Sequence, residues 1–167
     1  MRVLLLVLSL SVLTFSCRKN KVKGGDSIEI YQLKSYKNVT GKCQVDFTSA
    51  ILEDVPFVSN DEILEYNKAT HEYRLTAVAT DRVKTLGGKS PFAFAIDKAP
   101  IFYGFYMPPI MSSTCDHSIT MDVSYSQSNI IGLKLGYPGW IQGYTDIDDQ
   151  RNHPKILATL LKQGKLF

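Results

Sequence analysis

No excess of basic charge remains once the first 23 residues are set aside. The chain has 19 Lys and Arg against 16 Asp and Glu, and five of these bases but no acid fall in residues 1–23. Residues 24–167 therefore carry 14 bases and 16 acids, a net charge of −2. We expect no phosphate-neutralising face on such a body, which excludes nucleic acid as a default partner.

The sequence also lacks internal repeats and low-complexity segments. Hydrophobic residues make up 44% of the 167 residues and charged residues 21%, which excludes a disordered tail or a collagen-like fibre. A chain of this length and composition predicts one domain with a hydrophobic core of its own.

No apolar stretch is long enough to cross a bilayer, but a shorter one opens the chain. Residues 3–15 are apolar except for Ser9, Ser11 and Thr14, and Arg2 precedes them. A spanning helix needs about 20 apolar residues, whereas this length, with a positive start and a small residue near the end, is typical of a secretory signal peptide. We therefore expect residues 1–16 to be a signal peptide; the alternative is a short buried helix.

Residues 14–17, Thr-Phe-Ser-Cys, resemble the lipobox of bacterial lipoproteins, in which a peptidase cuts before an acylated cysteine. Cys17 and Ser16 match that motif, while Thr14 and Phe15 depart from it as in the loose lipoboxes of Bacteroidetes. The resemblance implies a lipid on Cys17 and a basic flexible tether over residues 17–26. It places the protein on a membrane of the cell envelope, facing the periplasm or the cell surface. Ordinary cleavage and release is the alternative, because Thr14 and Ser16 also satisfy the small-x-small rule.

The chain has three cysteines, and an odd cysteine in an exported protein needs an explanation. If Cys17 carries the lipid, Cys43 and Cys115 remain and can pair in an oxidising compartment. Their bridge would close a loop of 72 residue steps. The alternative is two buried free thiols.

Residues 27–167 predict a single α+β domain, mostly antiparallel sheet with two or three short helices packed on it. Alternating apolar residues predict the strands, and capping signals predict the helices. Strands are expected at 27–34, 72–76, 91–97, 101–107, 118–124 and 130–137, and helices from Ser59, over 77–86 and over 154–163. Residues 35–55 give no clear pattern.

Residues 73–121 resemble the first periplasmic head subdomain of the protein-export subunit SecD. The shared pattern runs from Leu75-Thr76 through an amphipathic helix and the strand 92–97 to a returning strand at Ile101 and a later strand at Ile119-Thr120. Lys98 stands where that family has a turn glycine, and its membrane domain is missing. Small bacterial lipoproteins of unknown function are similar over a longer stretch that includes residues 149–154 and 164–166. The resemblance implies contact with another protein rather than a reaction.

Aromatic residues gather in the predicted hairpin 91–107 and in the loop that begins near residue 137. If one face of the hairpin covers the core, the other presents an aromatic surface, and exposed apolar patches mark binding sites. The alternative is that both faces are covered and belong to the core. The predicted partner-binding residues are Tyr103, Phe105, Tyr106, Tyr137 and Trp140.

Two further clusters support an alternative function, that of an envelope hydrolase. Cys115 and His117 share one face of a strand, so a thiol nucleophile beside an imidazole base is geometrically feasible, although a disulfide at Cys115 excludes it. Residues 146–152 offer oxygen atoms at alternate positions, as calcium loops do, but lack the glycine and the bidentate glutamate of such loops. The candidate calcium ligands are Asp146, Asp148 and Gln150. The favoured prediction has no cofactor and no catalysis, and describes a module that binds another envelope protein or an exported chain.

Overall fold

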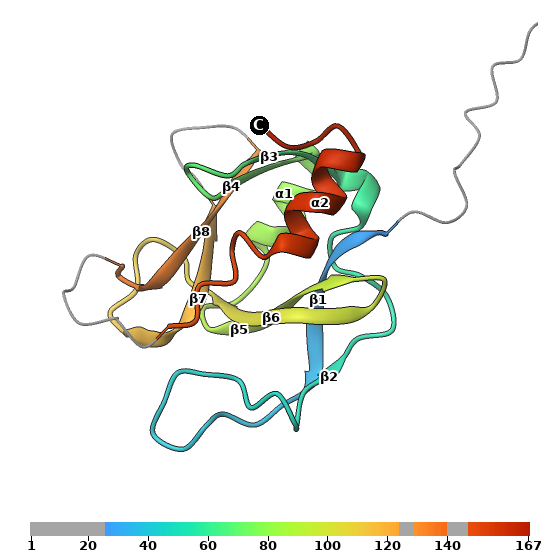
Figure 1. The fold of residues 1–167 in the computed structure, drawn as a ribbon. Helices are drawn as coiled ribbons and strands as arrows, with labels where there is room; N and C mark the ends of the chain where they lie inside the picture. Colours follow the sequence, from blue (N-terminus) through green and yellow to red (C-terminus); the bar gives the residue numbers. More distant parts are fainter. Residues whose placement is uncertain (1–25, 124–128, 140–146) are drawn as a thin grey trace, which may run out of the picture.

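An eight-stranded sheet organises the protein in the computed structural model, which describes residues 26–123, 129–139 and 147–167 (Figure 1). The strands lie in the order β2-β1-β5-β6-β7-β8-β4-β3. Every neighbouring pair is antiparallel except β6–β7, which is parallel. Their bounds are β1 Ile28–Ser35, β2 Ile51–Leu52, β3 Ile63–Asn67, β4 Glu72–Leu75, β5 Ser90–Ile96, β6 Ala99–Tyr106, β7 Cys115–Val123 and β8 Ile130–Tyr137. With the two helices described below, this confirms the predicted α+β class.

The β5–β6 hairpin follows the alternation of its residues. Phe92 and Phe94 on β5 belong to the core under the helices, whereas Ala93 and Ala95 lie in a small cluster on the opposite face. The turn falls at Asp97 and Lys98, both with positive φ, because Ile96 pairs directly with Ala99. Strand β5 therefore ends one residue before the expected range 91–97 ends, and β6 begins two residues before the expected range 101–107 begins.

Two helices pack on one face of the sheet. Helix α1 (Ala77–Lys84) begins at Thr76, whose side chain accepts a hydrogen bond from the backbone N–H of Ala79. Helix α2 (Pro154–Lys162) begins after His153, whose ring nitrogen accepts from the N–H of Lys155. Such caps satisfy N–H groups that have no partner within the helix.

The helix expected at Ser59 is a single 3₁₀ turn, Asn60–Glu62, followed by strand β3. The capping interaction is present, since the Glu62 carboxylate accepts from the Ser59 N–H at 2.9 Å. Pairing of Ile63–Asn67 with β4 prevents the helix from continuing. Tertiary hydrogen bonding thus overrides a local helix signal.

The main core lies between the helices and the sheet. Val83 of α1 and Ile156 of α2 contact a layer of buried rings from the strands. Tyr66 stacks on Tyr73 with ring centres 4.1 Å apart, and Tyr73 lies 5.1 Å from Phe94. Burial raises the pKa of the Tyr66 and Tyr73 hydroxyls.

The opposite face of the sheet is covered over only part of its width. Residues 36–50, here named the arm, leave the sheet between β1 and β2 and fold back beneath β6 and β7 (Figure 1). On β3, β4, β7 and β8 this face instead carries ion pairs, Glu65 with Arg74 and Asp122 with Lys134. The arm is therefore a local cover rather than a complete second layer.

Candidate functional site

A disulfide fastens the arm to the sheet. Cys43 on the arm and Cys115 at the start of β7 are joined, with Cα atoms 5.1 Å apart. The Ser118 hydroxyl donates a 2.7 Å hydrogen bond to the Cys43 carbonyl, and Val45 is buried in the same small cluster as Cys115. This bridge is the pairing that the cysteine count favoured. It also removes Cys115 and His117 from the hydrolase alternative, because a bridged Cys115 has no thiol to act as a nucleophile.

The arm has its own hydrogen-bonded structure. Asn38 and Val45 form an antiparallel bridge, and the Asp46 N–H donates to the Lys37 carbonyl at 2.8 Å. The Asp46 carboxylate accepts from both the N–H and the hydroxyl of Thr48, which lowers the pKa of Asp46. The arm is thus a small hairpin with fixed sides.

Two of the predicted partner-binding residues are in the core. Phe105 is 2% exposed and Tyr106 is 4% exposed. Tyr106 faces the helices, while Phe105 packs beneath the arm, with the Tyr36 ring 6.3 Å away in an edge contact. The aromatic-surface prediction is therefore wrong for Phe105 and Tyr106. Both faces of β6 are covered, one by helices and the other by the arm.

The other predicted aromatics differ in their surroundings. Tyr103 is partly exposed, and the Phe47 ring lies edge-on at 4.7 Å from it; burial raises the pKa of Tyr103. The Tyr137 hydroxyl donates to the Pro109 carbonyl at 2.9 Å and accepts from the Met111 N–H at 3.0 Å, so it fixes the β6–β7 connection. Trp140, like Cys17, lies outside the described residues.

Exposed apolar side chains concentrate on the arm and on the segment that follows it. Among the described residues, five of the ten large hydrophobic side chains that are exposed fall within residues 36–55. That segment is 20 of the 130 described residues, so the share is far above an even distribution. The five are Tyr36, Val39, Phe47, Ile51 and Val55. A concentration of exposed apolar residues on one segment is expected at a contact surface.

A hollow lies where the parallel strands β6 and β7 separate. The strands pair only from Gly104–Tyr106 to Ile119–Met121. Before that point a cavity of about 60 Å³ opens between the strands, the arm and residues 147–150. Its lining includes Phe47, Tyr103, His117, Asp148 and Gln150. The structure thus brings together residues that three separate sequence patterns singled out.

The hollow is small, and one of its polar side chains is already paired. Its volume of about 60 Å³ gives room for a few water molecules. His117 hydrogen-bonds the Asp116 carboxylate at 2.8 Å, which lowers the pKa of Asp116.

The candidate calcium loop is occupied by side-chain contacts. Gln150 donates to the Asp148 carboxylate at 2.6 Å. Arg151 donates to both oxygens of Asp149, which lowers the pKa of Asp149 despite partial burial. Asp146 lies outside the described residues. Within the described part of the chain, no group of three or more His, Cys, Asp or Glu side chains could hold a metal ion.

Comparison of the chain with models of protein families, with curated proteins and with solved structures finds no match. Neither helix in the described ranges is long and apolar enough to span a membrane. Among the described residues, the arm, its disulfide and its exposed side chains are the features that bear on function.

Proposed function

We propose that this protein is a lipid-anchored module of a bacterial cell envelope that binds another envelope protein or an exported chain through its arm. The observation that carries the proposal is the concentration of exposed apolar side chains on a segment that a disulfide holds in place. The lipid would be on Cys17, after cleavage of a signal peptide over residues 1–16.

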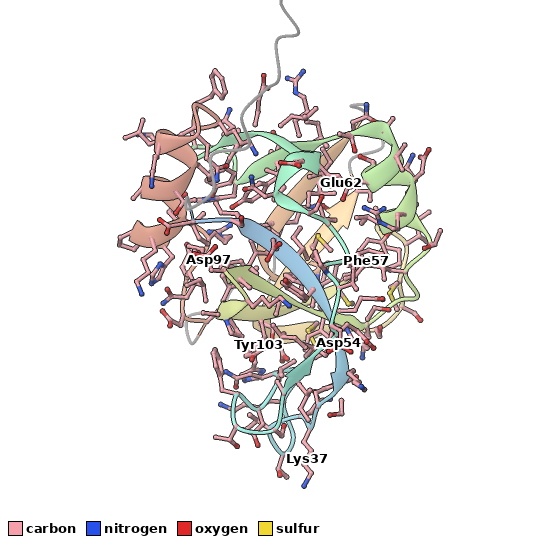
Figure 2. The ribbon with its side chains drawn as sticks, turned by 90° about the vertical axis from the view of Figure 1, so that its right-hand side faces the viewer. Lys37, Asp54, Phe57, Glu62, Asp97 and Tyr103 are labelled. Carbon is pink, nitrogen blue, oxygen red and sulfur yellow. A yellow bond between two sulfur atoms is a disulfide. The ribbon has the colours of Figure 1, made fainter. Side chains whose placement is uncertain are left out.

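The location of the arm supports this arrangement. The described chain begins beside Asp97, whose carboxylate accepts from the Ser27 N–H, and strand β1 leads from there to the arm. Asp97 and Lys37 are well separated, with Lys37 at the narrow end of the molecule (Figure 2). The eight residues of β1 extend about 26 Å at 3.3 Å per residue. A tether attached at residue 26 would leave the arm on the side away from the membrane.

The disulfide supports both the compartment and the binding role. Disulfides persist in oxidising compartments and are rare in reducing ones, which agrees with an exported protein. A clamped arm is also ordered before its partner arrives, so less conformational entropy is lost on binding than for a free loop.

A comparison of two double variants tests the arm together with Ile51, the first residue of β2, which directly follows it; the variant of Phe47 and Ile51 is called the arm variant. The tagged full-length protein is recovered from native membranes as wild type, as Phe47→Ala/Ile51→Ala, and as Val78→Ala/Leu161→Ala. The control pair is as exposed as the arm pair but lies on the helices, at 70% and 68% exposure. We expect the arm variant to lose its co-purifying proteins about tenfold, the effect of roughly 1.4 kcal/mol, and the control to keep them.

Equal recovery of every partner by the arm variant and the control would remove the arm from the proposal. The anchor is tested separately by Cys17→Ala, for which we expect the protein to move from the membrane fraction to the soluble fraction. An unchanged membrane fraction would contradict lipid attachment at Cys17.

A further inference from the structure

We infer that the partner of the arm is an acidic polypeptide segment, laid along the arm between its lysines and its two exposed aromatic rings. The inference rests on the proposed function and assigns the chemistry of the partner. Lys37 and Lys42 lie on the arm and Lys34 lies near the end of β1, just before the arm; the rings are those of Tyr36 and Phe47.

The arm and the end of β1 that leads into it carry unneutralised positive charge on a body that is otherwise slightly acidic. All nine residues from 34 to 42 are exposed, and they include three lysines and no acid. None of the three forms an ion pair with a described residue. Asp46 is close enough to Lys37 for that charge to lower its pKa, but Thr48 holds its carboxylate. Residues 34–50 therefore keep a net charge of +2, against −2 for residues 24–167.

The aromatic rings of the arm are fixed in place from behind. Tyr36 rests edge-on against buried Phe105, and Phe47 rests edge-on against Tyr103. Their outer sides remain open, with 60% of Phe47 exposed. Rings held in one orientation contribute contact area with little loss of side-chain entropy, which is typical of the central residues of an interface.

The distribution of these residues favours a polypeptide over a lipid surface. Segments that insert into a bilayer interface present large apolar residues at the inserting face. The turn of the arm, residues 39–42, holds only Val39 as an apolar residue and ends at Lys42, whereas Tyr36 and Phe47 lie along the sides. A partner that follows the sides of the arm meets both rings and the lysines, whereas a membrane that meets the turn meets Val39 and Lys42 but neither ring.

The bases that the partner would meet are all lysines. Arginine binds carboxylate or phosphate bidentately through its planar guanidinium, whereas lysine binds either anion as a point charge. The described chain contains no arginine before Arg74, so the arm offers only lysine point charges. Dispersed Glu and Asp side chains on an extended segment match three lysines spread over nine residues.

The test uses the full-length protein carried in phosphatidylcholine vesicles. The probe is a labelled peptide of alternating Glu and Phe, compared with the same peptide in which Lys replaces Glu. Binding is measured by fluorescence anisotropy at 50 mM and 500 mM NaCl. The variants are Lys34→Gln/Lys37→Gln/Lys42→Gln and a matched control elsewhere on the surface, Lys68→Gln/Lys98→Gln/Lys155→Gln, whose lysines are also exposed.

We expect the wild type to bind the acidic peptide and not the basic one. The arm triple variant should bind about 10- to 100-fold more weakly at 50 mM salt, as expected for three charge pairs near the surface. The difference should shrink at 500 mM because the Debye length falls to about 4 Å. Phe47→Ala should weaken binding at both salt concentrations, and the control triple variant should match the wild type.

Three outcomes overturn the inference: no binding of the acidic peptide, equal loss in both triple variants, or clustering with phosphatidylglycerol vesicles without peptide binding. The last outcome assigns a lipid surface in place of a polypeptide. None of them removes the proposed function if Phe47→Ala/Ile51→Ala still loses its partners in membranes. Conversely, if Phe47→Ala/Ile51→Ala keeps every partner in membranes, the proposed function is contradicted, whether or not the acidic peptide binds.

Discussion

Removal of the Cys43–Cys115 disulfide is the perturbation that the structure describes most completely. The bridge joins the arm to β7 across 72 residues of chain, so its loss frees the arm without deleting any of it. The Cys43→Ala/Cys115→Ala double variant leaves Cys17 as the one cysteine of the chain, so no other disulfide can form within it. Reduced wild type provides a second version of the same change.

The size of the effect follows from loop closure. In the chain-entropy model, a loop of 72 residues gives a stabilisation of about 4.4 kcal/mol at 25 °C. Unfolding entropy of about 2.1 cal/mol/K per residue over roughly 140 residues is about 0.3 kcal/mol/K, so Tm should fall by about 15 °C. Detachment of the arm also uncovers Phe105 and Met107, which adds to the loss.

Thermal unfolding and limited trypsin digestion measure the two consequences. Lys37 and Lys42 are exposed, and the hairpin of the arm restricts their backbone until the disulfide is removed. We expect the variant to melt about 15 °C lower than the oxidised wild type and to be cleaved first at these lysines. An unchanged Tm together with unchanged cleavage at the arm would refute the view that the disulfide holds the arm on the sheet.

Three further changes test other parts of the structure. Gly104→Ala places a Cβ 2.4 Å from the Ile119 carbonyl oxygen, so it should lower the free energy of unfolding by about 2 kcal/mol or more in urea titrations. The control Gly87→Ala should be nearly neutral, and equal effects of the two substitutions would contradict the close approach of β6 and β7. Phe105→Ala should lower the free energy of unfolding by about 3–4 kcal/mol in the same assay, because Phe105 is buried. A decrease below about 1 kcal/mol would contradict its burial. Burial lowers the pKa of His71 below 6.5 in the folded protein. As pH drops from 7 to 5, His71 therefore becomes protonated more readily in the unfolded chain than in the folded one, and the free energy of unfolding should fall. His71→Asn, which suits the positive φ at this position, should reduce that fall; an identical pH dependence in the variant would contradict the assignment.

The strands that bury their side chains on alternate sides could be predicted from the sequence. Residues 91–97 and 130–137 follow a period of two, and the structure has β5 and β8 there. The two helices with clear caps were also predicted, because Thr76 and Pro154 act through local geometry. The capping signal at Ser59 failed because pairing of β3 with β4 determines the conformation beyond one turn.

The candidate site was predicted only in part. Tyr103 lies at its edge, and the Cys43–Cys115 bridge holds the arm beside it. Phe105 was placed on the surface because its cover comes from residues 36–50, and Tyr106 because the helices cover the other face of β6. The arm has no regular period, and its position depends on a contact 72 residues away. The one signal in the sequence was Cys43, which follows a stretch where single apolar residues stand between lysines.

Mass spectrometry of the mature protein, purified from native membranes under non-reducing conditions, tests the account most directly. We predict a chain that begins at Cys17, carries acyl groups on that residue and has two fewer hydrogen atoms because Cys43 and Cys115 are joined. A chain that still begins at Met1, or one with three unmodified thiols, would contradict it.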